Sequence, residues 1–278
     1  MLMPSPPSTP TSATPKRPIG VFDSGVGGLS VLKALRAELP FEDFVYVSDS
    51  GHAPYGERDD AFVIERAHVI TQHLLAQHHI KALVMACNTA TAATIHLLRD
   101  QHPTLPIIGV EPALKPALAL SKTRRIGVMA TRGTLGSAKF QALLASLADQ
   151  ADFVCQPCDG LADAIERQDA PKIIAGIARY TGLMGQFGIN SGDIDTLVLG
   201  CTHYPFATQT LQDLLGPQVQ LIDNGEPVAR QTRRVLTELS APGAPGQCRL
   251  LCTGDADALQ QAAQRWLHLS ATAETLPI

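Results

Sequence analysis

The sequence lacks several features, and each absence excludes a class of protein. No stretch approaches the roughly 20 apolar residues that a membrane helix requires. Lys and Arg number 22 against 26 Asp and Glu, so the basic face of a nucleic-acid-binding protein is not expected. The first fifteen residues carry no charge and are rich in Pro, Ser and Thr, unlike a signal peptide. We therefore expect residues 1–16 to form a disordered tail on a cytoplasmic protein without membrane or nucleic-acid partners.

Disulfides are not expected either, because a secretion signal is missing and free thiols are the default outside an oxidising compartment. Cys155 and Cys158 have CxxC spacing, and together with Cys248 and Cys252 they leave zinc binding as a weak alternative. The second pair is separated by three residues within a predicted strand. We therefore expect no metal.

Short apolar, β-branched segments alternate with longer segments of helical period, which is the pattern of a parallel α/β sheet. The predicted strands are Pro18–Phe22, Phe44–Val47, Leu83–Ala86, Ile107–Gly109, Ile126–Met129, Phe153–Cys155, Leu197–Leu199, Leu221–Ile222 and Arg249–Cys252. The predicted helices are Gly28–Leu39, Asp60–His79, Thr89–Gln101, Ser137–Ala148, Leu161–Gln168, Lys172–Gln186, Phe206–Leu215, Pro227–Leu239 and Ala256–Leu267.

Two pairs of segments indicate an internal repeat. Ile19–Gly25 is similar to Ile126–Gly133, and Leu83–Thr89 is similar to Leu197–His203. The first residues of the two pairs are offset by 126 − 19 = 107 and 197 − 83 = 114 positions. The pattern predicts two similar α/β units with parallel sheets. Ligands of such sheets bind at the carboxyl ends of the strands, so a cleft between the units is the expected site.

Cys87 and Cys201 each follow one of the matching strands and stand just before a predicted helix. A helix N-terminus stabilises an anion, so we expect both thiols to have a lowered pKa. Inverting a stereocentre requires a base on one face and an acid on the other, and two matching thiols suit that task. Asp23 and His203 lie beside the thiols in the sequence and are the candidate proton carriers.

Other interpretations of these residues remain open. A single reactive cysteine with His203 as its base would favour a thiol hydrolase. Inert buried thiols in a binding module would be the plainest alternative. The glycine-rich segment 23–28 would suit a phosphate, but it lacks the Gly-x-Gly-x-x-Gly order and a Walker lysine.

The motifs reached so far resemble those of the bacterial glutamate racemases, within the aspartate/glutamate racemase family. The resemblance covers Pro18 to about Arg234 and rests on seven segments in family order. They are Phe22–Ser30, Pro54–Gly56, Ala86–Ala90, Gly109–Pro112, Ala130–Thr134, Gly200–Pro205 and Asp223–Gly225.

The resemblance implies a reaction and a set of residues that carry it. It implies cofactor-independent racemisation of glutamate, or of aspartate as the rival substrate, with D-glutamate supplied to peptidoglycan. Cys87 would serve the D face and Cys201 the L face, assisted by Asp23, His203 and Glu166. The implied substrate-binding residues are Asp23, Ser24, Tyr55, Gly56, Asn88, Thr89, Thr134, Thr202 and His203.

The resemblance also implies an architecture of two three-layer α/β domains with the active site between them. Residues 17–111 and 224–278 would form the first domain, and residues 112–223 the second. Family members often pair, so a homodimer is one expected assembly.

Overall fold

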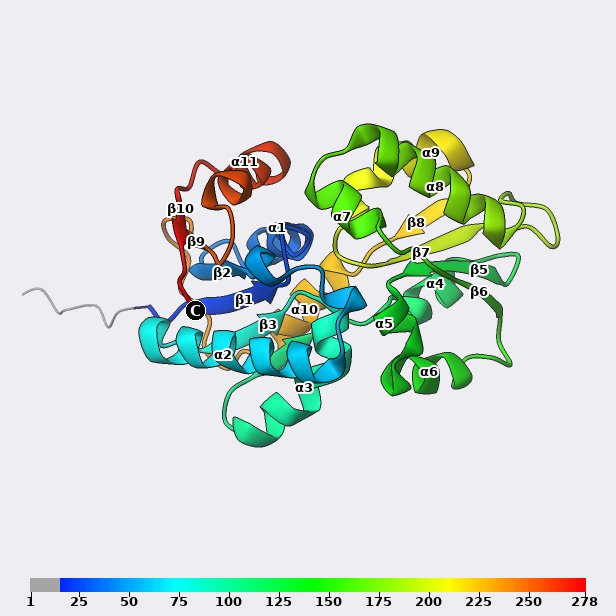
Figure 1. Cartoon of the computed structure of the whole chain (residues 1–278). Helices are drawn as coiled ribbons and strands as arrows, with labels where there is room; N and C mark the ends of the chain where they lie inside the picture. The colour runs from blue at the N-terminus through cyan, green and yellow to red at the C-terminus, as the bar shows by residue number, and fades with distance from the viewer. Residues whose placement is uncertain (1–15) are drawn as a thin grey trace, which may run out of the picture.

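The computed structural model describes residues 16–278, which fold into two α/β halves lying side by side (Figure 1). The predicted tail over residues 1–16 lies outside the described residues except for Lys16. The chain passes from the first half to the second after Gly109 and returns after Ile222. It therefore crosses between the halves twice.

The first half is built on a six-stranded sheet of order β10-β9-β2-β1-β3-β4, in which every pair is parallel. Its central strand, β1, is buried at every position, as expected for a strand covered on both faces. The strands are β1 (Ile19–Asp23), β2 (Phe44–Ser48), β3 (Ala82–Met85), β4 (Ile107–Gly109), β9 (Cys248–Cys252) and β10 (Ala273–Thr275).

Helices cover both faces of this sheet and give the half three layers. On one face, α1 (Leu29–Glu38), α10 (Gly225–Val235) and α11 (Ala256–Leu267) form one apolar core with β1 and β2. On the other face, α2 (Asp60–His78) and α3 (Asn88–Gln101) form a second core. Two short 3-10 helices, η1 (Ser50–His52) and η2 (Tyr55–Glu57), lie in the loop between β2 and α2.

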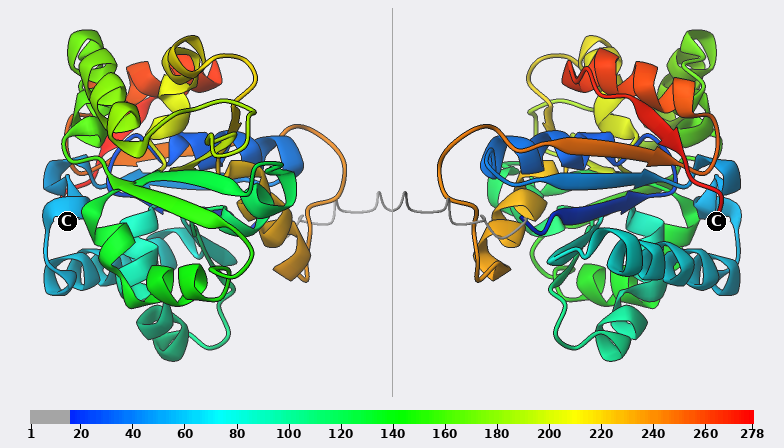
Figure 2. Two further views of the ribbon diagram at one scale, coloured as in Figure 1. Left: turned by 90° about the vertical axis from the view of Figure 1, so that its right-hand side faces the viewer. Right: turned by 90° about the vertical axis from the view of Figure 1, so that its left-hand side faces the viewer.

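The second half repeats this plan on a parallel sheet of order β6-β5-β7-β8. Helices again lie on both faces, as the end-on views in Figure 2 show. The strands are β5 (Arg125–Ala130), β6 (Asp152–Pro157), β7 (Thr196–Gly200) and β8 (Gln220–Ile222). One face carries α4 (Leu114–Leu120) and α6 (Ala138–Ala145), with α5 (Arg132–Gly136) between them in sequence. The other carries α7 (Leu161–Glu166), α8 (Ala170–Met184) and α9 (Thr208–Leu215).

The predicted fold class is confirmed, because the strand orders β2-β1-β3-β4 and β6-β5-β7-β8 correspond one to one. The similar sequence segments fall on equivalent strands, with β1 matching β5 and β3 matching β7. All nine predicted strands are present, with ends shifted by at most two residues. The sequence did not predict β10, α4, α5 or the 3-10 helices.

The weak zinc alternative is not supported by the fold. Cys155 and Cys158 lie on or just after β6, whereas Cys248 and Cys252 lie on β9 in the other sheet. All six cysteines are free. Among residues 16–278, no helix combines the length and apolar character needed to cross a membrane.

Candidate active site

A cavity of about 470 Å³ lies between the two halves. Cys87 from the first half and Cys201 from the second both line it, so the matching strand ends do converge on one space. Most of the predicted substrate-binding residues line it as well. They are Ser24, Tyr55, Gly56, Asn88, Thr89, Thr202 and His203, together with the predicted helper Glu166.

Cys87 follows β3 and is the N-cap residue of α3. Its Sγ accepts a hydrogen bond from the Ala90 N–H at 3.5 Å and lies 3.6 Å from the Ser24 hydroxyl. Burial, reinforced by the nearby Asp23 carboxylate, nevertheless raises the pKa of the Cys87 thiol to about 12. The expected lowering of its pKa is therefore wrong, because the helix N-terminus does not compensate for the lost hydration.

Cys201 follows β7 but is not at the N-terminus of an α-helix. The helix predicted from Phe206 begins at Thr208, and a 3-10 helix, η3 (Tyr204–Ala207), precedes it. The expectation that both thiols share a helix terminus is therefore wrong for Cys201. Its charged partner is His203 instead, whose Nδ1 lies 3.7 Å from the sulfur.

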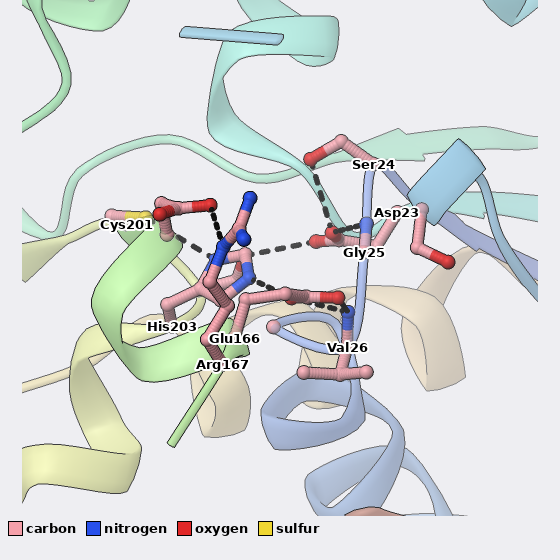
Figure 3. Close-up of polar contacts among 12 residues, drawn as sticks. Asp23, Ser24, Gly25, Val26, Glu166, Arg167, Cys201 and His203 are labelled. Carbon is pink, nitrogen blue, oxygen red and sulfur yellow. Dashed lines mark hydrogen bonds and ion pairs between the residues drawn. The ribbon is translucent and has the colours of Figure 1, made fainter. Parts of the chain in front are cut away.

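His203 is held between Cys201 and Glu166, as Figure 3 shows. Its Nε2 lies 2.6 Å from Glu166 Oε2, and the Val26 N–H donates to both oxygens of that carboxylate, at 2.9 Å to Oε2 and 3.1 Å to Oε1. Burial alone would lower the pKa of His203, but its hydrogen bonds to Cys201 and Glu166 hold the pKa well above the usual value. The raised pKa favours the protonated form of the imidazole that lies between the Cys201 sulfur and the Glu166 carboxylate.

Asp23 lies behind the cavity wall and does not line the cavity. Its fully buried carboxylate accepts the Gly25 N–H at 2.7 Å and, from the other half, the Thr202 hydroxyl at 2.8 Å. Burial raises the pKa of Asp23 to about 6, although His203 and these hydrogen bonds act in the opposite direction. A carboxyl group with this pKa can change its protonation state near neutral pH.

The loop between β1 and α1 fits against the second half because two of its residues have no side chain. A Cβ on Gly25 would lie 2.6 Å from Glu166 Oε2, and a Cβ on Gly27 would overlap the His203 ring. Ser30 adds a hydrogen bond from its hydroxyl to the Thr202 carbonyl at 2.9 Å. The two glycines therefore allow the first half to contact the acid–base groups of the second.

The remaining predicted residues differ in their access to the cavity. Asn88 Oδ1 is buried without a hydrogen-bond partner, one of the few such side-chain atoms among the described residues. Thr89 lines the cavity and shares a 3.1 Å hydrogen bond with Thr131 of the second half. Thr134 does not line it; its hydroxyl accepts a hydrogen bond from Thr131 at 2.9 Å.

Several residues that line the cavity were not predicted. Charged side chains are prominent among them, and the set includes Ser50, Glu57, Thr131, Cys158, Asp159, Asp163, Arg167 and Asp255. They come from loops and helix ends of both halves. Only Thr131 stood near the end of a predicted strand. The pattern of apolar residues in the sequence therefore could not show that most of the other residues would line the cavity.

The residues of this site form no group suited to a metal ion. Across residues 16–278, the structure has no cluster of three or more His, Cys, Asp or Glu side chains that could hold one. The residues at hand are thiols, an imidazole, carboxylates, hydroxyls and an amide. They can bind a small charged molecule and move protons.

Comparison with known proteins gives consistent matches along the chain. Residues 19–232 match the family model described as Asp/Glu/Hydantoin racemase. A glutamate racemase from Cupriavidus pinatubonensis is 49% identical over 266 residues, covering 94% of this chain and 95% of that protein.

Solved structures show the same likeness in three dimensions. Glutamate racemase isoform RacE1 from Bacillus anthracis superposes with a TM-score of 0.82 at 31% identity, covering 94% of this chain and 97% of that one. A glutamate racemase from Francisella tularensis in complex with D-glutamate gives a TM-score of 0.79 at 26% identity, covering 94% and 97%.

Proposed function

The chain belongs to the Asp/Glu/hydantoin racemase family, and from that premise we propose that it interconverts L- and D-glutamate with two cysteines and no cofactor. The observation that carries the proposal is the convergence of two thiols, from equivalent strands of the two halves, on one cavity. Relatives that cover nearly the whole chain are named glutamate racemases, and one related structure holds D-glutamate, which supports glutamate as the substrate.

The cavity offers partners for each charged group of an amino acid. The unpaired Oδ1 of Asn88 suits the ammonium group, because a buried acceptor without a donor is costly until it is satisfied. Asn88 and Thr89 begin α3 and bring first-turn N–H groups to the cavity, where they suit a carboxylate. Ser24 and Thr202 also line the cavity, and their hydroxyls donate to Asp23 behind it.

Proton transfer from the L face begins at Cys201, whose sulfur acts as a thiolate and lies 3.7 Å from His203 Nδ1. The thiolate removes the α-proton, and the C–H electron pair remains on the substrate as a carbanion. The neutral Cys87 thiol then delivers its proton to the opposite face, which yields the D enantiomer and leaves a Cys87 thiolate.

The reverse reaction uses the same groups with exchanged roles. Cys87 must then lose its proton before it can act as a base, and Asp23 is the nearby buried carboxylate that can accept or relay it. Donors fixed around the α-carboxylate and exclusion of water from the cavity would stabilise the carbanion. The reaction therefore needs no electron sink.

We also propose a domain division and a role in the cell. Residues 17–111 with 224–278 and residues 112–223 are the two domains, which agrees with the strands of the two sheets. The D-glutamate formed would supply peptidoglycan synthesis in the cytoplasm, where six free cysteines stay reduced. Cells depleted of the enzyme should then require added D-glutamate to grow.

A thiol hydrolase is the second candidate, because Glu166, His203 and Cys201 lie in one hydrogen-bonded line. That arrangement resembles a nucleophile, its base and the group that orients the base. A hydrolase would form a covalent adduct on Cys201 and would not need Cys87. The racemase accounts for both thiols.

Single cysteine variants separate the two candidates. Cys87→Ala and Cys201→Ala should each abolish racemisation in both directions, because one face of the substrate then has no proton carrier. Any remaining exchange of the α-proton with solvent should be confined to the enantiomer that faces the surviving thiol. Near-normal turnover by Cys87→Ala would overturn the two-cysteine mechanism. Cys155→Ala, which removes a thiol away from the cavity, is the matched control and should remain active.

A further inference from the structure

Asp49 is a fully buried carboxylate that lies beside the cavity but has no part in the proton transfers above. It follows β2 and precedes the loop 50–58, which carries η1 and η2. Six residues of that loop line the cavity: Ser50, Ala53, Pro54, Tyr55, Gly56 and Glu57. The environment of Asp49 therefore bears on how one wall of the site is held.

Five side-chain hydrogen bonds converge on this one carboxylate. Arg66 of α2 binds it with two nitrogens, Nε to Oδ2 and Nη2 to Oδ1, both at 2.9 Å. Thr253, just after β9, donates to Oδ1 at 2.7 Å, and His52 Nδ1 lies 3.0 Å from the same atom. Tyr55 donates to Oδ2 at 2.5 Å.

This network keeps Asp49 ionised. Burial opposes ionisation, but the hydrogen bonds from Arg66, Tyr55 and Thr253 outweigh it and lower the pKa of the carboxyl group. A bidentate guanidinium–carboxylate pair fixes the geometry of both partners as well as their charge. The network thus joins α2, the end of β9 and loop 50–58 at one point.

The hydroxyl of Tyr55 is the only polar atom of its side chain, and it is used by Asp49 rather than directed to the cavity. Tyr55 is among the residues that line the cavity, and it is only 1% exposed. Gly56, the next residue, faces Thr131 of the second half, which a Cβ on Gly56 would approach to 3.0 Å. Loop 50–58 therefore forms both a wall of the cavity and a contact between the halves.

We propose that Asp49, with Arg66, is a positioning centre that fixes loop 50–58 against the second half and so sets the affinity for the substrate. The inference rests on the proposed racemase function. It assigns Asp49 and Arg66 no contact with the substrate and no role in proton transfer. Loss of the network should weaken binding of both enantiomers, because the same wall faces either one.

The test uses Asp49→Asn, Arg66→Lys and Arg66→Met in the full chain. Asp49→Asn should raise KM for D- and L-glutamate by at least about tenfold, while kcat changes by less than about threefold. Among the arginine variants, Met should raise KM more than Lys, because lysine retains the charge but not the bidentate geometry. Tyr55→Phe should raise KM in the same direction, and it leaves the Arg66–Asp49 pair intact.

Glu42→Gln is the matched control. Glu42 is also a buried carboxylate in the first half; it pairs with Lys81 at 2.6 Å and accepts two hydrogen bonds from Ser240, away from the cavity. Its loss should lower the melting temperature, as that of Asp49 would, but leave KM unchanged. A KM effect of equal size in both variants would mean that Asp49 only stabilises the fold.

Hydrogen–deuterium exchange separates failure of this inference from failure of the proposed function. Backbone amides of residues 50–58 should exchange faster in Asp49→Asn than in the wild type or Glu42→Gln. If the wild type does not racemise glutamate, the proposed function fails, and the exchange result still decides whether Asp49 fixes the loop. Unchanged exchange together with unchanged KM in a folded Asp49→Asn protein would overturn the inference, and Tyr55→Phe decides the matter if Asp49→Asn does not fold.

Discussion

Asp23 is a fully buried carboxyl group that connects the two halves through the Thr202 hydroxyl. Its pKa of about 6 means that its ionised form is disfavoured by burial in the folded state. The folded chain thus binds this proton more tightly than the unfolded chain, whose Asp pKa is near 3.8. Ionisation of Asp23 accordingly lowers the free energy of unfolding above pH 6. This destabilisation disappears as the pH falls to about 4.

Asp23→Asn should therefore raise the free energy of unfolding at pH 8 by up to about 3 kcal/mol while lowering turnover. The gain should shrink steadily between pH 6 and pH 4, where wild-type Asp23 becomes protonated in both states. Urea unfolding at several pH values measures this difference. A variant that is less stable than the wild type at pH 8 would show that the charge of Asp23 contributes to folding.

Asp195 is a control, because its ionisation should change the stability of the protein in the opposite direction to that of Asp23. Burial opposes its ionisation, but the Ser121 hydroxyl and the Thr123 and Lys122 amides lower its pKa. A carboxyl group whose pKa is lowered by folding stabilises the folded state when the pH is above its unfolded-state pKa, here 3.8. This stabilisation is lost as the pH falls through the folded-state pKa. Asp195→Asn should thus destabilise the protein at pH 8, and the deficit should shrink toward low pH.

At the scale of elements, the loop between β1 and α1 shows how a backbone position can serve the reaction. Gly27 faces the end of the His203 side chain, which can move more readily than backbone can. Adding a methyl group there would displace a catalytic group without disrupting a core. Stability and activity should therefore respond differently to the same change.

Gly27→Ala should lower kcat/KM by at least about a hundredfold, because the His203 ring can no longer stay between Glu166 and Cys201. The free energy of unfolding should fall by about 1 to 3 kcal/mol, because the buried hydrogen bonds of His203 and Thr202 are disturbed. Gly182→Ala in α8 is the control, since a Cβ there meets nothing within 4 Å and should leave kcat/KM unchanged. Full activity of Gly27→Ala would contradict the assigned position of His203.

The sequence predicted those elements that have strong periodicity. Buried parallel strands such as β1 and β7 are short apolar segments in the sequence, and nine of the ten strands among the described residues were predicted. The missed elements lack that signal: β10 is three residues long and largely exposed, and α5 has two glycines among five residues. Helix α4 has Pro116 in its first turn, which obscures its pattern.

The site was predicted only in part, for a related reason. Cys87 and Cys201 could be found because each follows a strand of the repeat. The hydrogen bonds from Thr202 to Asp23 and from Thr253 to Asp49 join residues 179 and 204 positions apart. Local patterns do not encode such pairs, so neither the burial of Asp23 behind the cavity nor the network at Asp49 was foreseen.

At the scale of the whole molecule, the two halves meet around the cavity at several separate points. The Gly25–Gly27 loop contacts Glu166 and His203, and Gly56 contacts Thr131. Further out, the rings of Phe206 and Trp266 stack across the halves with centroids 3.8 Å apart and an angle of 9°. These contacts hold the two halves together around the cavity, and exclusion of water from it would favour a reaction through an unstabilised carbanion.

The central claim is that both halves contribute one proton carrier to a single stereocentre. The most direct test is proton NMR of the wild-type protein with D-glutamate, and separately with L-glutamate, in D2O. The account predicts that the product enantiomer appears with deuterium at the α-carbon, while the remaining starting enantiomer keeps its α-proton at early times. Equal deuterium in both enantiomers from the start, or no exchange by folded protein with reduced thiols, would contradict it.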